Sequence, residues 1–442
     1  MSTVLGITLP NSWSAAPLKH VTSMLNRGSA PDYVDVGPVR AISQASNQAS
    51  GLDWSRTRFH DFSGNPKNLK GHLRQNDVLI NSTGTGTLGR VGYFTDSPDG
   101  LPCMADSHVT IARAKPDELD ARFSYYWLRS RPFQEYVYAA LVVGATNQIE
   151  LNRDRLGDTP VPLPPLEEQR RIADFLDTET ARIDRMTELR REQSRLWRAR
   201  YEAFLYEQFM DRSAVENETR ETTWLGPVPR RWSAPTIGRI SRFTMGTTFP
   251  HEYQGLREGD FPFIKVGDFQ LADEVGNLDT AENWISRETA RQLGARIVPP
   301  GSVLYARVGA ALLLNRRRIT TRPSVVDDNV RAITFTDGAP HYWGALLSLL
   351  DMGQLVNPGP VPSIGESQVA AVRVPTAPRN VQTTIADRVV QHQKTLHRIK
   401  ASIDRQVDLL AERRQALITA AVTGQFDVST ASGRNVTDGV TA

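Results

Sequence analysis

The chain has 442 residues, of which 40% are hydrophobic, and its 52 basic and 49 acidic side chains leave a formal net charge of +3. This length exceeds what one hydrophobic core holds and predicts two to four domains, while the near balance of charge means that any nucleic-acid-binding surface must come from local clusters. The single cysteine, Cys103, excludes a disulfide framework and a cysteine-based zinc site.

Neither a membrane span nor a secretion signal is predicted. No apolar run approaches the ~20 residues that a membrane helix needs, and the run at 310–314 is only as long as a strand. The N-terminus lacks a basic segment followed by an apolar stretch. We therefore expect a cytoplasmic protein with no membrane partner.

Residues 1–165 are predicted to form a first globular domain of mixed α and β structure. Short runs in which polar and apolar residues alternate predict strands, and longer apolar-rich runs fit helices better. The predicted strands are 77–81, 90–94 and 108–112, and the predicted helices are 123–128 and 133–143. This order lacks the regular strand and helix alternation of a doubly wound sheet, so we expect an α+β fold.

The segment from Gly84 to Gly89 matches the G-x-G-x-x-G pattern of dinucleotide-binding sites. Such a site needs a helix next, with its N-terminus at the pyrophosphate, whereas the alternating run 90–94 follows here. We interpret the segment as a turn between strands, whose amides and hydroxyls suit contact with a phosphate backbone. A nucleotide-dependent enzyme is an alternative, and it would require the isolated protein to bind a dinucleotide.

Residues 166–210 are predicted to form one long helix. Four prolines between 160 and 165 exclude a helix upstream, and residues 166–209 contain neither Gly nor Pro. Such a helix would span on the order of 65 Å at ~1.5 Å per residue. Its apolar residues recur at three- and four-residue steps with charges between them, which predicts a stripe that packs on a partner helix.

Residues 211–378 are predicted to repeat the first domain loosely. Both domains begin with Trp-Ser-Ala, at Trp13 and Trp232, and Asp77-Val-Leu corresponds to Ser302-Val-Leu. The similarity is thin in the globular parts and strong in the helices. This contrast indicates that the two helical spacers share one role, whereas the two domains face different targets.

Residues 379–426 are predicted to be the partner helix, and residues 427–442, rich in Ser, Thr, Gly and Asn, are expected to be disordered. The triplet Ile172-Ala-Asp recurs 213 positions later as Ile385-Ala-Asp. This internal repeat predicts a pseudo-two-fold arrangement in which the two helices form an antiparallel coiled coil. The predicted seam consists of Ile172, Leu176, Ile183, Met186, Val389, Leu396, Ile399, Ile403, Leu410 and Leu417.

Local clusters of basic residues and the glycine-rich turn are the candidates for contact with nucleic acid. The alternative for each residue is an ordinary solvated surface. In the functional interpretation they neutralise phosphates, while a few side chains reach base edges. The candidates are Arg56, Arg58, Lys67, Lys70, Arg74, Ser82, Thr83, Thr85 and Arg90 in the first domain and Lys265, Tyr305, Arg307, Arg316, Arg317 and Arg318 in the second.

No constellation of residues predicts catalysis. The sequence contains no Walker loop, no H-E-x-x-H motif and no Asp-Pro-Pro-Tyr or Asn-Pro-Pro-Tyr methyltransferase motif. The eight histidines are scattered without metal-ligand spacing. We therefore expect a chain without a catalytic or metal site.

The start of the first helix, Pro162-Leu-Pro-Pro-Leu-Glu-Glu-Gln169, and the end of the second, residues 412–425, resemble the conserved spacers of the specificity subunit of type I restriction-modification enzymes. The order of domain, helix, domain and helix resembles that family over the whole chain. The resemblance implies two target recognition domains, each of which reads one half of a bipartite site in double-stranded DNA. It also implies that the helices set the spacing of the half-sites. The second helix departs from the pattern, because Val381 stands where the first has Glu168.

The same resemblance implies the partners. Two modification subunits would bind S-adenosylmethionine and methylate adenine, and restriction subunits would use ATP and Mg²⁺ to translocate and cleave DNA in defence against phage. This chain would be a non-catalytic recognition subunit that carries no cofactor. The alternative is a coiled-coil scaffold that binds proteins and no DNA, which the near-neutral domains favour. A steep loss of DNA affinity with salt would separate the two hypotheses.

Overall fold

The protein consists of two compact units, each of which contains one globular part and half of each long helix. The computed structural model describes residues 2–144, 149–210, 219–222, 224–357 and 359–428. Unit 1 comprises Met1–Leu189 with Gln406–Ala442, and unit 2 comprises Arg190–Arg405. The expected disordered tail at 427–442 lies almost wholly outside the described residues.

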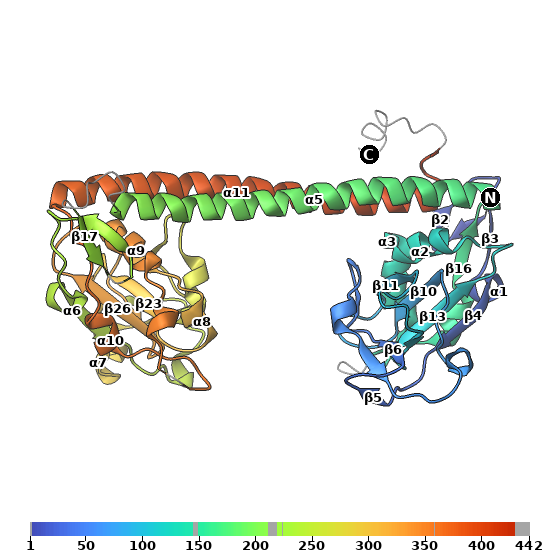
Figure 1. The fold of residues 1–442 in the computed structure, drawn as a ribbon, viewed down its shortest axis with the longest axis horizontal. Helices are drawn as coiled ribbons and strands as arrows, with labels where there is room; N and C mark the ends of the chain where they lie inside the picture. The colour runs from blue at the N-terminus through green and yellow to red at the C-terminus, as the bar shows by residue number, and fades with distance from the viewer. Residues whose placement is uncertain (1, 145–148, 211–218, 223, 358, 429–442) are drawn as a thin grey trace. The chain divides into compact units, whose positions relative to one another are not determined.

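The two long helices are α5, Leu166–Phe209, and α11, Arg379–Val422. In unit 1 the first part of α5 contacts the last part of α11, and Asp184 pairs with Arg414 at 3.2 Å. In unit 2 the ring of Phe204, near the end of α5, stacks on His392, near the start of α11. The helices therefore run antiparallel and side by side in each unit (Figure 1), which confirms the predicted fold class.

The predicted seam is buried most completely where a globular part covers the helix pair. Leu189 and Leu196 continue the apolar pattern of α5 but are 52% and 61% exposed, because two helices alone cover only a narrow stripe. Ile172, Leu176, Ile183, Val389, Ile403 and Leu417 are buried, and Met186, Leu396, Ile399 and Leu410 are half-buried.

Two four-stranded sheets form the globular part of unit 1. The first has the order β11-β10-β13-β4, and all its pairs are antiparallel. The second has the order β12-β6-β9-β5, in which β12 and β6 are parallel. The strands are β4 Thr22–Arg27, β5 Tyr33–Val34, β6 Val39–Ile42, β9 Arg58–His60, β10 Asp77–Asn81, β11 Val91–Phe94, β12 Cys103–Ala105 and β13 Val109–Ala114.

The helices of unit 1 lie between the first sheet and the long helices. The predicted helix 123–128 is the middle of α2, Ala121–Arg129. The predicted helix 133–143 is shorter than expected: α3, Arg131–Tyr136, passes into a π-helical turn, Val137–Leu141, and ends in the short strand β14, Val142–Val143. The predicted strands at 77–81, 90–94 and 108–112 are confirmed as β10, β11 and β13.

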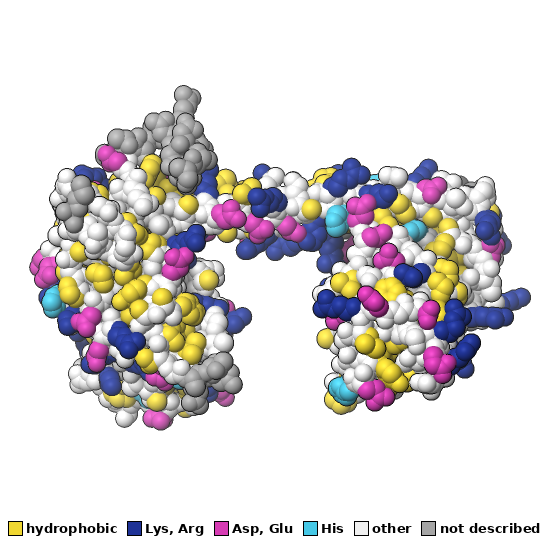
Figure 2. Space-filling model, turned by 180° about the vertical axis from the view of Figure 1, so that it is seen from behind, with side chains coloured by type: hydrophobic (Ala, Val, Ile, Leu, Met, Phe, Trp, Pro, Cys, Tyr) yellow, Lys and Arg dark blue, Asp and Glu magenta, His cyan; other side chains and the backbone are white. Residues whose placement is uncertain are grey.

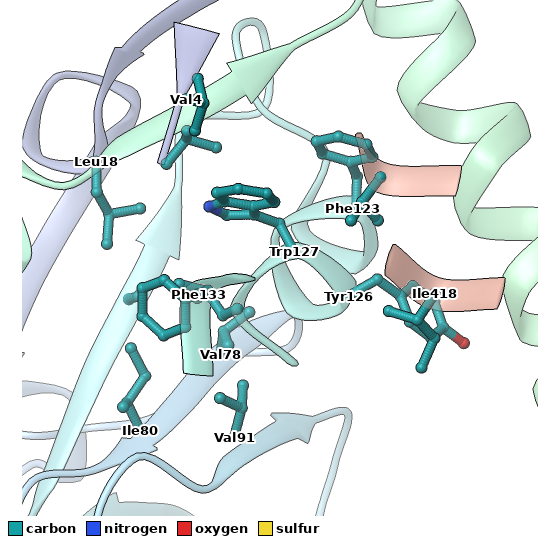
Figure 3. Close-up of a cluster of buried hydrophobic side chains, with 14 of the residues drawn as sticks. Val4, Leu18, Val78, Ile80, Val91, Phe123, Tyr126, Trp127, Phe133 and Ile418 are labelled. Atoms are coloured by element: carbon teal, nitrogen blue, oxygen red, sulfur yellow. The ribbon is translucent and has the colours of Figure 1, made fainter. Parts of the chain in front are cut away.

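The core of unit 1 joins the sheet, the short helices and α11 (Figure 3). Val78 and Ile80 of β10 face Trp127 and Phe133 within this cluster, and Ile418 of α11 closes it. Leu79, between them, belongs to a separate cluster on the other face of the sheet. Strand β10 is thus buried on both faces, which explains its continuous apolar run.

Unit 2 repeats this architecture. A five-stranded sheet has the order β19-β26-β23-β24-β21, and a three-stranded sheet has the order β22-β20-β25. Helix α9, Pro340–Leu349, contributes Tyr342, Trp343 and Leu346 to the core. The strands are β19 Ser241–Met245, β20 Phe261–Ile264, β21 Asn277–Leu278, β22 Asn283–Ile285, β23 Val303–Ala306, β24 Arg318–Thr320, β25 Val325–Val326 and β26 Val330–Phe335.

The internal repeat is preserved in the register of the strands. In unit 1 Val78 pairs with Ala112, and in unit 2 Val303 pairs with Ile333, so β10 corresponds to β23 and β13 to β26. The parallel pair is also repeated, because β12 lies beside β6 and β25 lies beside β20. The weak sequence similarity of the two domains therefore reflects one shared backbone plan.

Candidate nucleic-acid interface

In unit 1, three loops meet where β6 and β10 end and β13 begins. The Thr83 hydroxyl, just after β10, donates to Gln44 Oε1 at 3.0 Å, just after β6. The same hydroxyl lies 2.8 Å from Nδ1 of His108, which precedes β13. With the exposed Thr85, these residues form what we call loop surface 1: Gln44, Thr83, Thr85 and His108.

The turn from Gly84 to Gly89 carries the exposed end of loop surface 1. Gly84, Gly86 and Gly89 have φ angles of +93°, +81° and +80°, a region that favours glycine. The next element is strand β11, so the helix that a dinucleotide site would require does not follow. The structure therefore agrees with the predicted turn between strands.

Helix α3 and the π-helical turn hold this loop from behind. Gln134 Nε2 donates to the carbonyl of Gly89 at 3.0 Å, and the Tyr138 hydroxyl donates to the carbonyl of Leu88 at 3.0 Å. Arg90 donates to Gly86 O and to Gln48 Oε1, each at 3.0 Å. Sequence reasoning missed Gln134 and Tyr138, because only the packing of α3 brings them to a loop some fifty positions earlier.

Unit 2 presents the corresponding loops with different side chains. Arg307 follows β23, and its backbone N–H donates to the carbonyl of Asn329 at 2.9 Å. Lys265 follows β20, where Ile264 O accepts the N–H of Asp327 at 2.9 Å. We call Lys265, Arg307 and Asn329 loop surface 2. Arg307 occupies the position of Ser82, and Asn329 occupies that of His108.

Both loop surfaces share one turn whose aspartate is tied to the backbone. Asp106 Oδ1 accepts the N–H of His108 at 2.8 Å, and Asp327 Oδ1 accepts the N–H of Asn329 at 2.9 Å. Burial raises the pKa of both carboxyls above the ordinary aspartate value. These acids are turned into the loop, which lessens their repulsion of an approaching phosphate.

A glycine in each unit allows the chain to pass against this turn. A Cβ on Gly28 would lie 1.8 Å from the carbonyl oxygen of Ala105, and a Cβ on Gly246 would lie 1.9 Å from that of Asp327. No other residue fits at either position without moving the backbone. Gly28 follows β4 and Gly246 follows β19, so the two glycines lie at corresponding places. Sequence analysis did not identify them, because nothing in their spacing marks the close approach of the backbone.

The predicted basic cluster of unit 1 lies on the surface. Arg56, Arg58, Lys67, Lys70 and Arg74 are all exposed. Arg56 pairs with Asp53 at 3.0 Å, and the Arg58 guanidinium lies 4.0 Å from the ring centre of Tyr33. These cations are free of the core and available to solvent.

Three candidates instead lie inside the protein. The Ser82 hydroxyl is hydrogen-bonded to that of Thr110 in the core. Tyr305 is fully buried, and burial raises the pKa of its hydroxyl. Arg317 is 8% exposed and donates to Asn315 and to the carbonyl of Leu350. Ser82 and Tyr305 therefore offer no surface to a DNA backbone, and Arg317 is accessible only through a hollow that it helps to line.

The remaining candidates of unit 2 are partly accessible. Lys265 is half-buried, with its Nζ 4.4 Å from the ring centre of Phe249, and Arg307 is half-buried as well. Arg318 is half-buried and donates to the carbonyl of Phe269 at 2.6 Å. Arg316 is exposed, so the basic run at 316–318 is divided between surface and interior.

The described part of the chain contains no group of three His, Cys, Asp or Glu residues that could hold a metal ion. None of its helices is long and apolar enough to cross a membrane. Cys103 is buried, and burial raises the pKa of its thiol to about 12, so the thiolate is disfavoured at neutral pH.

Comparison with known proteins relates residues 63–193 to a family described as the type I restriction modification DNA specificity domain. A putative type I restriction enzyme MjaX specificity subunit from Methanocaldococcus jannaschii is 22% identical over 279 residues, which is 61% of each chain. The EcoBI specificity subunit from Escherichia coli is 27% identical over 157 residues, 33% of this chain and 32% of that one. The aligned part thus spans less than two thirds of these relatives.

Solved structures share the fold over nearly the whole chain. A chain from a study of complex assembly and conformational transition of the type I R-M system matches 95% of this chain and 100% of its own, with a TM-score of 0.71 and 18% identity. The HsdS subunit from Thermoanaerobacter tengcongensis matches 95% and 98%, with a TM-score of 0.51 and 18% identity. At this identity the likeness is one of fold.

Proposed function

We propose that this chain is the non-catalytic DNA-recognition subunit of a type I restriction-modification complex. The proposal is supported by the match of residues 63–193 to a type I restriction modification DNA specificity domain and by the fold that the chain shares with solved structures such as an HsdS subunit. Each globular part would read one half of a bipartite site in double-stranded DNA. The proposal includes action inside the cytoplasm, where DNA is accessible, in defence against phage.

The observation that carries the proposal is the pair of loop surfaces. They occupy corresponding places on one repeated backbone, held by the same aspartate turn and the same close glycine, yet they display different side chains. Loop surface 1 offers an amide, hydroxyls and an imidazole, whereas loop surface 2 offers two cations and an amide. Such groups bind phosphates and base edges, and their difference suits two unlike half-sites.

We propose that α5 and α11 set the distance between the half-sites. A helix of 44 residues has a length of about 66 Å at ~1.5 Å per residue, and readers on one face of DNA favour spacings near ~34 Å, one helical turn. A paired helix resists bending more than a single one, which would keep the spacing constant.

We also propose that the repeated helix starts, at Leu166 and Arg379, dock two modification subunits. The repeat supplies two similar surfaces related by a pseudo-two-fold, as two copies of one partner require. S-adenosylmethionine would then belong to the modification subunits, and ATP with Mg²⁺ to the restriction subunits. This chain would carry no cofactor and would supply recognition alone.

Methylation mapping in cells that express this chain with its modification subunits tests the proposal. We expect adenine methylation at a single bipartite motif. Exchange of residues 1–165 for the corresponding domain of another specificity subunit should change one half of that motif and leave the other unchanged. A change in both halves would contradict the assignment of one reader to each unit.

A protein scaffold is the second candidate, and the surface charge favours it. On the face seen in Figure 2, basic and acidic side chains are interspersed over both globular parts. A scaffold predicts DNA binding that is weak or independent of salt. The recognition subunit predicts a steep fall of affinity with salt, because each neutralised phosphate releases counterions.

A further inference from the structure

We propose that a basic hollow in unit 2, outside loop surface 2, binds a phosphate group. The hollow has a volume of about 380 Å³ and lies between the globular part and the two long helices. Arg316 and Arg317 line it from the loop before β24 and Arg318 from the first position of that strand, while Arg198 of α5 and Lys400 of α11 line it from the helices.

The lining carries more positive than negative charge. The lining holds five Arg and Lys side chains and two carboxylates, those of Asp273 and Glu274. Two of the cations are paired along their own helices, Arg198 with Glu202 at 3.4 Å and Lys400 with Asp404 at 2.5 Å, which leaves the three arginines at 316–318 without such a pair within the described part of the chain. The Asp273 carboxylate is already occupied within its own turn, since it accepts the N–H of Val275 at 2.9 Å, the N–H of Asn277 at 2.8 Å and the side-chain amide of Asn277 at 3.0 Å. The excess of cations is therefore not neutralised by this acid.

Arg317 shows most directly that an anion is missing. Its side chain is buried, yet its guanidinium donates only to neutral groups: the carbonyl of Arg316 at 3.1 Å, Asn315 Oδ1 at 2.7 Å and the carbonyl of Leu350 at 3.3 Å. Its Nε has no partner among the described residues. Buried cations are ordinarily paired with an acid.

Burial lowers the pKa of Arg317 to about 10 and lowers that of Arg318, with the charge of Arg316 as the next cause for Arg318. The charges of Arg316 and Arg318 thus destabilise one another, whereas Tyr305 and Asp351 oppose the lowered pKa of Arg317. A bound anion with several acceptor oxygens would relieve that repulsion and meet the unpaired donor. Phosphate has this chemistry and matches the planar donors of arginine.

A hollow of unit 1 beside α3 serves for comparison. It is lined by Arg129, Arg131, Glu135 and Gln415, among others. Burial lowers the pKa of Arg129 to about 10, and its guanidinium donates to the carbonyl of Ala49 at 3.0 Å. Arg131 is paired with Glu135 at 2.6 Å, so it provides a control outside the proposed site.

The source of the phosphate rests on the proposed function. If the chain recognises DNA, the site takes a backbone phosphate beyond the half-site that loop surface 2 reads, without regard to sequence. A free phosphate or nucleotide is the other source of the same chemistry. The experiment below distinguishes the two.

The test uses the complex of this chain with its modification subunits and DNA that contains the methylated motif. Arg316 and Lys400 are exposed, so the double substitution Arg316→Ala with Lys400→Ala leaves the core intact. We expect the slope of log affinity against log salt to fall by about 1 to 2, since each phosphate contact contributes ~0.9. The methylated motif should stay the same, and Arg131→Ala should leave the slope unchanged.

A second measurement follows thermal unfolding of the chain in inorganic phosphate and in chloride at equal ionic strength. If phosphate stabilises the wild type and not the double variant while the slope is unchanged, the site stands and its ligand is a free anion. If the slope is unchanged and phosphate has no effect, the proposal is overturned. If the wild-type complex does not bind the motif at all, the proposed function is contradicted. The measurement with inorganic phosphate would still test the site in that case.

Discussion

The two globular parts attach to the long helices at corresponding places but by different chemistry. In unit 1, Trp13 Nε1 donates to Glu168 Oε1, in the first turn of α5, at 3.1 Å. In unit 2 the corresponding tryptophan is Trp232, and Val381 stands in the place of the glutamate. Trp232 Nε1 is buried with no partner among the described residues. Both units therefore have the tryptophan, but only unit 1 has the glutamate that accepts its hydrogen bond.

Two glutamines at corresponding positions of the repeat, Gln169 and Gln382, show the same contrast. Gln169 Oε1 accepts the N–H of Asp120 at 2.8 Å, and its Nε2 donates to the carbonyls of Pro164 and Glu118. Gln382 donates to the carbonyl of Ala377 at 2.8 Å, and its buried Oε1 meets no partner within the part of the chain that the structure describes. The joint of unit 1 is thus a satisfied polar network.

The joint of unit 2 combines an ion pair between Arg379 and Asp337 with aromatic packing. Phe209, at the end of α5, contacts the ring of Tyr342 at 5.2 Å between centroids, and both are fully buried. The Tyr342 hydroxyl donates to the carbonyl of Pro375 at 2.8 Å. In unit 1, Arg122 of α2 pairs with Asp174 at 2.7 Å and with Asp177 at 2.9 Å near the start of α5, and the ring of Trp13 packs edge-on against Phe123. Both joints therefore combine polar and aromatic contacts, and they differ in whether the shared tryptophan and glutamine find partners among the described residues.

Phe209→Ala should have the largest effect, because it destabilises the joint of unit 2 and leaves that of unit 1 unchanged. Removal of this buried ring leaves a cavity and should lower the free energy of unfolding of unit 2 by about 3–5 kcal/mol. Hydrogen exchange of the full chain would show the loss of protection in α9. Phe175→Ala, at a half-buried ring that contacts Phe426, should cost less. Equal loss of protection in both units would contradict an independent joint.

Gln169→Leu compared with Gln382→Leu measures the polar networks. The first substitution leaves one buried N–H and two carbonyls unpaired and should cost roughly 1–3 kcal/mol. Gln382→Leu removes one hydrogen bond, to the carbonyl of Ala377, and also removes an unpaired oxygen, so it should lower the free energy of unfolding by less. Chemical denaturation of both variants, followed by circular dichroism, makes the comparison. A larger cost at Gln382 would show that its network extends beyond the contacts described above.

Val381→Glu should make unit 2 resemble unit 1. The new carboxylate would stand where Glu168 stands and accept from Trp232 Nε1, which should add about 1 kcal/mol of stability. Thermal unfolding measures the gain. The added substitution Trp232→Phe should remove it, because phenylalanine has no donor; a gain that persists would have a different origin.

Acidification should weaken unit 2 slightly through His341 in α9. Burial lowers the pKa of His341 below the ordinary 6.5, opposed by the charge of Asp273. The unfolded chain therefore binds the proton more readily, so stability is present above about pH 6.5 and declines as pH falls toward the lowered value. Thermal unfolding between pH 7 and pH 5 should show a smaller decline in His341→Gln. An unchanged decline would assign the effect to other groups.

The sequence alone determined the features that depend on neighbouring residues. Residues 166–209 contain no helix breaker and carry an apolar stripe, so the predicted helix 166–210 begins where α5 begins and ends one residue beyond it. The strand at 77–81 and the glycine turn after it follow from alternation and from the φ angles that glycine permits. The shared motifs at Ile172 and Ile385 revealed the repeat before any strand register was known.

Which polar groups meet and which are exposed depends on how distant segments of the chain pack together. Arg316 and Arg317 are neighbours of one residue type, yet one lies in solvent and the other under the loop and helix that fold over it. Gln44, Thr83 and His108 are scattered along the chain and come together because β6, β10 and β13 place their ends side by side. Exposure and contact depend on residues distant in sequence, and local patterns do not record which of these will pack against a given side chain.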